Sequence, residues 1–151
     1  MSTIKRPPGR ITYRPAGITD IPAIFAIRLA VRENRLSDPA SITHADVVAY
    51  LDKVGRGWVA ESGDMILGFS FANRSGLVWA LFVAPGQEGR GIGTTLLARC
   101  TAWLREEGVA TAFLETGVGT RAEGFYRAHA WRETARAGES VSFVQTLENN
   151  S

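Results

Sequence analysis

A glycine-rich stretch carries the clearest chemical signal in this chain. Gly89, Gly91 and Gly93 stand at alternate positions, after an apolar run over 77–83 that Pro85 ends. Glycine has no Cβ, so the backbone can turn sharply and its N–H groups can converge on one point. Helix formers follow, and a helix N-terminus adds free N–H donors and partial positive charge. The stretch therefore predicts a strand, a turn and a helix start that together bind an anion, with phosphate as the expected ligand.

The spacing distinguishes between phosphate-binding loops. A P-loop needs Gly-Lys-Ser/Thr after its turn, and no lysine follows this one. The dinucleotide fingerprint needs a third glycine where Thr94 stands. The order Glu88-x-x-Gly91-x-Gly93, behind a strand that ends in Val-x-Pro, resembles the acyl-CoA loop of the GCN5-related N-acetyltransferases (GNAT). The alternative is a glycine-rich turn that has no ligand.

The resemblance implies a cofactor and the residues that contact it. It implies acetyl-CoA and no metal, with backbone N–H groups doing most of the pyrophosphate binding. The family has Gln or Arg where this chain has Glu88, which leaves a side-chain role at that position open. The implied contact residues are Leu81, Phe82, Val83, Glu88, Gly89, Arg90, Gly91, Ile92, Gly93, Thr94 and Tyr126.

A second segment resembles the same family. Residues 122–131 match the pattern A-x-x-F-Y-x-x-x-G-F, except that Ala130 replaces Gly and Trp131 replaces Phe. We expect these two changes to alter packing only. Gly119 takes the place of the usual Asn three residues before the alanine, so a side-chain contact to the cofactor is expected to be lost.

Tyr126 is the candidate general acid. Acetyl transfer needs a neutral amine, a stabilised oxyanion and a proton or hydrogen bond for the leaving thiolate. Tyr126 has a phenolic hydroxyl that can donate to that thiolate, and the family's Tyr at this position is a frequent general acid. The alternative is a packing residue that caps a helix. The sequence indicates no activated nucleophile, so we expect direct transfer in a ternary complex.

Glu115 is the candidate general base. The apolar run over 77–83 contains no acid, whereas Glu115 lies near the end of the run over 110–116. Family members that acetylate protein N-termini have Leu-Glu-Val on this strand, and they use that Glu with a later Tyr as base and acid. Alternatively, Glu115 is an ion-pair partner or a solvated residue, and ordered water carries the proton.

The candidate acceptor residues lie on the first expected helix and the central strand. On a helical wheel of residues 21–36, Arg28 and Arg32 fall inside the broad apolar arc rather than opposite it. In the family this helix borders the acceptor cleft, so either arginine could bind an acceptor carboxylate. Alternatively, their stems cover apolar surface and their charged heads reach water. Trp79 or Phe82 could line the same cleft, because alternate residues of a strand face opposite sides.

Periodicity and turn residues predict the order β-α-α-β-β-β-α-β-α-β-β. Strands are expected over 10–14, 57–61, 65–72, 77–83, 110–116, 131–135 and 140–147, and helices over 19–36, 43–54, 92–104 and 121–129. Short turns predict an antiparallel meander, and a helical crossover predicts a parallel strand after it. This order is that of the GNAT family. It implies an α/β (α+β) fold, a single mixed central sheet of six to seven strands with helices on both faces.

Composition describes an ordinary globular protein. The 151 residues predict a flexible segment over 1–9 and one domain over 10–148. With 17 basic and 15 acidic residues, no strong field for nucleic acid is expected. No signal peptide and no apolar run of about 18 residues is visible, so we expect a cytoplasmic protein with no membrane partner. The lone Cys100 excludes an internal disulfide and is expected to pack in the core.

The remaining residues narrow the expected function. His44 and His129 show no metal-ligand spacing, and His129 is expected in the core. The interpretation is an N-acetyltransferase that transfers acetyl from acetyl-CoA to a small-molecule or peptide primary amine, with homodimerisation left open. The alternative is a catalytically silent acyl-CoA-binding module that serves as a sensor or partner subunit. Glu88 and Gly119 favour that alternative, and Tyr126 disfavours it.

Overall fold

The computed structural model describes residues 10–30, 44–49, 51, 53 and 55–147. In chain order the elements are β1 (Thr12–Pro15), the 3₁₀ turn η1 (Ile18–Asp20), α1 (Ile21–Ala30), α2 (His44–Ala49), β2 (Gly55–Ser62), β3 (Met65–Asn73), β4 (Val78–Val83), α3 (Ile92–Glu106), β5 (Thr111–Gly117), α4 (Arg121–Ala128), β6 (Arg132–Ala137) and β7 (Ser140–Thr146). The expected order and the α/β (α+β) class are confirmed, with strand ends within two residues of expectation. Two expectations fall outside the described residues: the flexible segment over 1–9, and the part of the first helix over 31–36.

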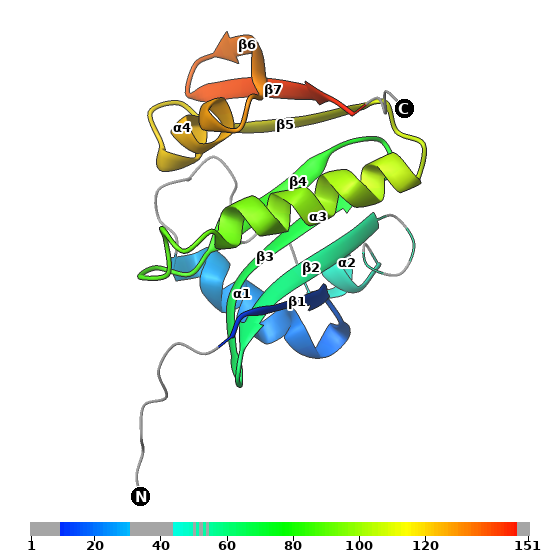
Figure 1. Ribbon diagram of the computed structural model, residues 1–151, viewed down its shortest axis with the longest axis vertical. Coiled ribbons are helices and arrows are strands. Elements are labelled where there is room, and N and C mark those ends of the chain that lie inside the picture. The colour runs from blue at the N-terminus through cyan, green and yellow to red at the C-terminus, as the bar shows by residue number, and fades with distance from the viewer. Residues whose placement is uncertain (1–9, 31–43, 50, 52, 54, 148–151) are drawn as a thin grey trace, which may run out of the picture.

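Hydrogen bonding divides the strands into two antiparallel sheets, β1-β2-β3-β4 and β5-β7-β6, rather than one continuous sheet. The sheets meet at a single parallel bridge between Leu77 and Phe113, which confirms the expected direction of β5. Beyond the bridge, β4 stays with β3 and β5 stays with β7, so strand twist opens a wedge between them. Figure 1 shows the three-stranded sheet above the four-stranded one, with α3 lying across one face of the four-stranded sheet. One edge of β4 and one edge of β5 are therefore left unpaired along the wedge.

A β-bulge marks the start of this divergence. Val78 pairs with Ala72 and Ala80 pairs with Phe71, so Trp79 is an extra residue in β4. Such a bulge bends its strand and increases the local twist. It lies just after the bridge at Leu77, where β4 begins to turn away from β5.

Helices cover both faces of the four-stranded sheet, as expected. On one face α3 buries an apolar stripe that includes Leu96, Cys100 and Leu104. On the other face α1 buries Ile21, Ile24 and Ile27 against aromatic residues of β3. The four-stranded sheet is therefore a rigid layer between two hydrophobic cores, and its edge strand β4 borders the wedge.

A charged cluster anchors the N-terminal strand. Arg14 donates two hydrogen bonds of 2.8 Å to the carboxylate of Asp20 and one of 2.9 Å to Glu61. Asp20 also accepts from the backbone N–H of Gly17, at 2.8 Å. Asp20 therefore closes the short turn η1 ahead of α1. The Arg14 hydrogen bonds lower the pKa of the Asp20 carboxyl, although burial opposes the effect.

Candidate functional site

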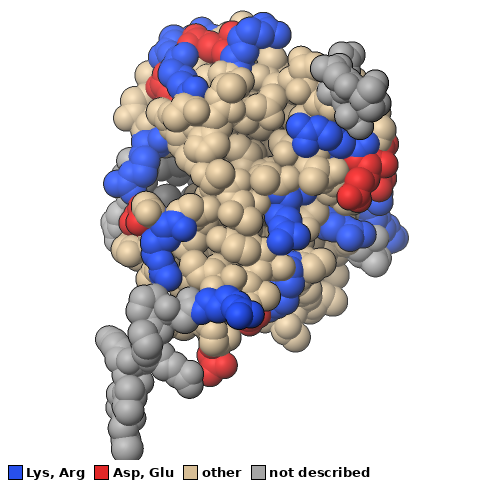
Figure 2. Space-filling model, viewed as in Figure 1, with Lys and Arg blue, Asp and Glu red and all other residues tan. Residues whose placement is uncertain are grey.

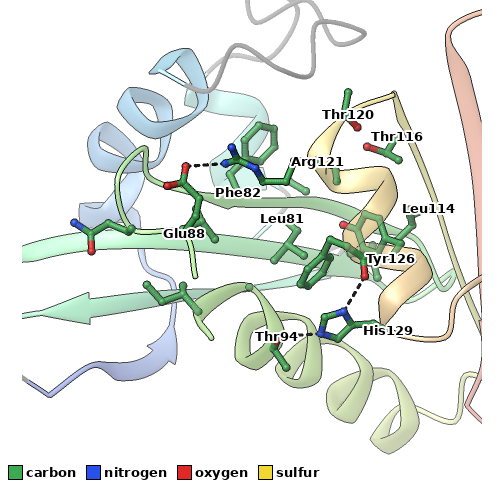
Figure 3. Close-up of a pocket in the computed structure, with 18 of the residues that line it drawn as sticks. Leu81, Phe82, Glu88, Thr94, Leu114, Thr116, Thr120, Arg121, Tyr126 and His129 are labelled. Atoms are coloured by element: carbon green, nitrogen blue, oxygen red, sulfur yellow. Dashed lines mark hydrogen bonds and ion pairs between the residues drawn. The ribbon is translucent and has the colours of Figure 1, made fainter. Parts of the chain in front are cut away.

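A pocket of about 510 Å³ lies in the wedge between β4 and β5. Its walls come from β4 and the loop after it, the first turn of α3, the end of β5 and one face of α4 (Figure 3), and Ala30 at the end of α1 also lines it. The pocket therefore forms where these elements meet around two unpaired strand edges.

The glycine-rich loop forms the end of the pocket next to α3. Gly86, Gly89 and Gly91 have φ angles of 89°, 82° and 81°, in the left-handed region that side chains other than glycine rarely adopt. Gly91 is the N-cap of α3, and no protein atom lies within 4 Å of the place where a Cβ would be. The loop thus leaves open space directly before the free N–H groups of a helix, as an anion site requires.

The structure brings nearly all the expected cofactor residues to one pocket. Leu81, Phe82, Val83, Glu88, Gly89, Gly91, Ile92, Gly93, Thr94 and Tyr126 all line it. Arg90 is not among the lining residues, and its guanidinium donates to Oε1 of Gln87 at 2.6 Å. Phe82 stacks on Phe69, with ring centroids 5.3 Å apart.

The Glu88 side chain has a structural role that sequence reasoning left open. Its Oε1 accepts from the N–H of Gly86 at 2.9 Å, and its Oε2 lies 3.1 Å from Nη1 of Arg121. Figure 3 shows this ion pair spanning from the loop to the start of α4. Backbone N–H groups of Glu88 itself and of Gly86, together with Arg121, lower the pKa of the carboxyl. Sequence reasoning missed Arg121, although an acid in a phosphate loop is a signal to look for a cation that offsets it.

Tyr126 lies in the core side of the pocket wall. Only 5% of the residue is exposed, and its ring packs against Phe125, Trp131 and Phe143. Burial raises the pKa of the phenol, so the hydroxyl keeps its proton. No described residue is hydrogen-bonded to that hydroxyl, which leaves it free to donate into the pocket.

Glu115 lies on the exposed side of β5, where it also lines the pocket. Burial alternates along β5, with Leu114 and Thr116 inside and Glu115 outside. Within the described part of the chain Glu115 forms no ion pair. Glu115 is therefore either a carboxylate that is available to an incoming group or a solvated strand residue.

His129 lies in the pocket wall and not in the core where we expected it. Its Nδ1 lies 2.8 Å from the carbonyl oxygen of Phe125, and its Nε2 lies 2.8 Å from Oγ1 of Thr94. Its ring packs on that of Phe125, with centroids 4.1 Å apart. The spacing contains a signal for this position, because Phe125 and His129 are one helical turn apart and share the face that carries Ala122.

The expected acceptor residues are only partly described. Arg28 lies in the last turn of α1, and Ala30 of the same helix lines the pocket, but Arg28 itself is not among the lining residues. Arg32 lies outside the described residues, and so does the side chain of Trp79. Their roles therefore stay predictions.

The two departures from the family pattern around α4 have backbone consequences. Gly119 has a φ of 79°, and its N–H donates to Oε1 of Glu123 at 2.7 Å. This bond, with those from Arg127 and Arg136, lowers the pKa of Glu123 to about 2. Ala130 has a φ of 68°, which is uncommon for a residue with a Cβ. We expected the change to Ala130 to affect packing only, and the structure shows a strained backbone instead.

Few charged groups determine the electrostatics of the pocket. Among the described lining residues Arg121 is the sole Lys or Arg, and Glu88 and Glu115 are the acids. Figure 2 shows basic side chains spread among uncharged residues on the visible face rather than gathered at one place. In the described ranges no three His, Cys, Asp or Glu residues are grouped as metal ligands, and no described helix is long and apolar enough to cross a membrane.

Cys100 is not a candidate nucleophile. It is fully buried on the core face of α3, as expected, and burial raises the pKa of its thiol to about 12. A thiol with so little thiolate at neutral pH is a poor nucleophile.

Comparison with known proteins identifies the family. The model of the acetyltransferase (GNAT) family matches residues 22–131, more than half of the chain. The chain therefore belongs to the GNAT family of acetyltransferases. A comparison with curated proteins found no match.

Solved structures with the same fold include two that hold the expected cofactor or its thiol form. YncA from Salmonella typhimurium contains its cofactor acetyl-CoA; it is 18% identical, with a TM-score of 0.73 over 95% of this chain and 97% of that one. PaiA N-acetyltransferase from Thermoplasma acidophilum is in complex with coenzyme A; it is 16% identical, with a TM-score of 0.74 over 91% and 99%. A GNAT-family protein from Desulfovibrio desulfuricans is 18% identical, with a TM-score of 0.77 over 92% and 100%. At these identities the likeness shows the fold alone.

Proposed function

We propose that this protein transfers an acetyl group from acetyl-CoA to a primary amine by direct attack in a ternary complex. One observation carries the proposal: the pocket runs between the unpaired edges of β4 and β5 and ends at the glycine-rich loop before the N-terminus of α3. A pantetheine arm is extended and contains amide groups, so it can pair with a free strand edge as an added strand does. Its pyrophosphate then reaches the loop and the N-terminus of α3.

The side chains in the pocket have the groups that the reaction needs. The phenol of Tyr126 keeps its proton and is free to donate to a leaving thiolate. Glu115 provides a carboxylate that can accept the proton that the acceptor's ammonium must lose before the neutral amine attacks, either directly or through water. The unpaired edge of β4 provides N–H donors for the oxyanion.

A thiol-release assay tests this function. The protein is incubated with acetyl-CoA and a panel of primary amines, and free CoA is measured together with the mass of the acetylated product. We expect thiol release that depends on the amine. In the absence of an amine, intact mass should show no acetyl-enzyme, since Cys100 is buried and its thiol is protonated.

The alternative is a catalytically silent acyl-CoA-binding module. The Glu88–Arg121 ion pair favours it, because the loop holds an acid where a phosphate is expected to bind. Saturable CoA binding without turnover on any amine in the panel would support the module. Turnover on one amine would exclude it.

For the acceptor we propose a small molecule or peptide that carries a carboxylate beside its amine. The support is the placement of Arg28 in the last turn of α1, the helix whose end at Ala30 borders the pocket. The test compares a carboxylate-bearing acceptor with its amide. Arg28→Ala and Arg32→Ala should raise KM for the acid only, and equal effects on both would remove these arginines from the acceptor site.

A further inference from the structure

Two hydrogen bonds determine which ring nitrogen of His129 carries the proton. Nδ1 lies 2.8 Å from the carbonyl oxygen of Phe125, which can only accept, so Nδ1 is protonated. In neutral imidazole the other nitrogen then has a lone pair and no hydrogen. Nε2 lies 2.8 Å from Oγ1 of Thr94, so the Thr94 hydroxyl must donate its hydrogen to Nε2.

This arrangement determines what Thr94 presents to a ligand. Thr94 lines the pocket in the first turn of α3, directly after Gly93. A hydroxyl has one hydrogen, and here His129 accepts it, so only lone pairs remain for the pocket. Phosphate oxygens are acceptors as well. A phosphate beside Thr94 therefore gains no hydrogen bond from this hydroxyl while His129 is neutral.

Protonation of His129 reverses the direction of the bond. The imidazolium has an N–H donor at each nitrogen, so Nε2 donates to Oγ1 and the Thr94 hydrogen can turn toward the pocket. We propose that His129 is a positioning residue that sets the direction of the Thr94 hydroxyl, so that binding of a phosphate-bearing ligand is linked to protonation of His129. The inference rests on the proposed function, because the ligand is taken to place its pyrophosphate at the glycine-rich loop.

The other titratable groups of the pocket walls do not provide this linkage. The pKa of Glu88 is lowered and that of Tyr126 is raised, so neither changes charge near neutral pH. Arg121 stays cationic throughout. Glu115 also lines the pocket, and a Glu115→Gln variant separates its contribution from that of His129.

Among the described residues, the other contacts of His129 carry no competing charge. From β7, the side-chain amide of Gln145 donates to the His129 carbonyl at 3.2 Å, and it is neutral at all relevant pH values. On α4 itself, Arg127 is paired with Glu123 one turn earlier. The Nε2 of His129 is thus directed at the Thr94 hydroxyl, as Figure 3 shows.

Linkage gives the sign of the effect. If the ligand gains a hydrogen bond only when His129 is protonated, ligand binding favours the protonated imidazole and takes up a proton. Affinity is then highest where His129 is protonated and falls as rising pH removes that proton. One net hydrogen bond corresponds to a change of about three- to tenfold in Kd.

The experiment is calorimetric titration with dephospho-CoA at pH 5.5 and pH 8. This probe retains the pyrophosphate but lacks the phosphomonoester, whose own titration near pH 6 would obscure that of His129. For the wild-type protein we expect Kd about three- to tenfold lower at pH 5.5. At a pH near the midpoint of this change in Kd, titrations in two buffers of different ionisation enthalpy should show uptake of part of a proton on binding.

Three variants separate a positioning role from a structural one. Thr94→Val should lose the pH dependence and the proton uptake, whereas Thr94→Ser should keep both. His129→Leu should also lose the pH dependence. Because it leaves the Thr94 hydrogen free, it should bind at pH 8 at least as tightly as wild type. A residue that only supported the fold would weaken binding at both pH values when removed.

Thr95→Val is the matched control, because Thr95 is the next residue of α3 and does not line the pocket. It should behave as wild type. If wild type, Thr94→Val and His129→Leu share one pH dependence, or if no proton is taken up, the inference is wrong while the proposed function stands. If wild type binds neither CoA nor dephospho-CoA, the proposed function itself fails.

Discussion

Nη1 of Arg121 lies 3.1 Å from Oε2 of Glu88, and this ion pair joins the glycine-rich loop to the first residue of α4 at the exposed rim of the pocket. Glu88 therefore pairs with Arg121, the cation that a ligand phosphate would otherwise contact. We expect Glu88→Gln to release Arg121 and to bind CoA about two- to fivefold more tightly at low salt, a small gain because exposed pairs are weak. The measurement is CoA affinity at two salt concentrations.

Arg121→Gln is the counterpart of this variant. Removing the cation should weaken CoA binding and reduce its dependence on salt, while pantetheine, which has no phosphate, should bind both proteins equally. Weaker CoA binding by Glu88→Gln would mean that Glu88 positions Arg121 for the ligand rather than competing with it.

The glycine loop gives the second prediction. Gly91→Val places a Cβ in the open space before the N-terminus of α3, where the pyrophosphate is expected. CoA affinity should fall at least about tenfold, since close approach of the phosphate is blocked. The positive φ also costs about 1–2 kcal/mol of stability in any such variant.

Gly138→Val separates the two effects. Gly138 has a φ of 60° in the β6–β7 turn, with no protein atom near its would-be Cβ, and it does not line the pocket. It should lose similar stability and keep CoA affinity. Unchanged CoA binding by folded Gly91→Val would remove the loop from the cofactor site.

Tyr126→Phe is the third prediction. It removes the hydroxyl alone and keeps the ring contacts with Phe125 and Trp131. If the phenol protonates the thiolate, kcat should fall about 10²-fold with CoA affinity unchanged. Tyr13→Phe on β1, which does not line the pocket, is the control and should retain wild-type kcat. A wild-type kcat in Tyr126→Phe would show that Tyr126 is a packing residue.

The strained backbone at Ala130 gives the fourth prediction. Ala130 has a φ of 68°, and glycine adopts this conformation without the penalty of a Cβ. Ala130→Gly should therefore stabilise the protein by about 1 kcal/mol, or about 2–4 °C in Tm for a chain of this size. Ala128→Gly, within α4, should instead destabilise by about 0.5–1 kcal/mol. Equal losses of stability in both variants would show that the backbone at Ala130 is not strained.

The fifth prediction concerns acid stability. Arg14 lowers the pKa of Asp20 in the folded state, so Asp20 contributes stability above its ordinary pKa of about 3.9. That contribution is lost as pH falls through the lowered value. At pH 7, Asp20→Asn should cost about 2 kcal/mol, since hydrogen bonds to charged groups are lost. The cost should shrink below about pH 4. Urea unfolding against pH measures this, and exposed Asp64→Asn should show no such trend.

Local features of the site were predictable from sequence, and contacts between distant segments were not. The turn at Gly91 and the core face of α3 follow from glycine chemistry and a helical period, which act within a few residues. The bond from Thr94 to His129 joins residues 35 apart, and no periodicity encodes such a pair. The motif also did not predict the strain at Ala130, because a sequence pattern specifies a residue type and not its φ angle.

The wedge was not predictable for a related reason. Alternation along β4 and β5 shows which residues face each side, but it does not show whether two neighbouring strands are hydrogen-bonded. Only the bridge from Leu77 to Phe113 satisfies the expected parallel pairing. The pocket therefore arises where the predicted single sheet is interrupted, between β4 and β5.

The single bridge between the sheets also has a consequence for folding cooperativity. The described strands of 12–83 and those of 111–146 share no other strand pairing, so each group can lose its protection from hydrogen exchange as a separate unit. A ligand lying along both free edges would couple the two groups. Amide hydrogen exchange in β5 and β7 would then slow together with that in β4, and the cofactor would act as part of the folded framework as well as a reactant.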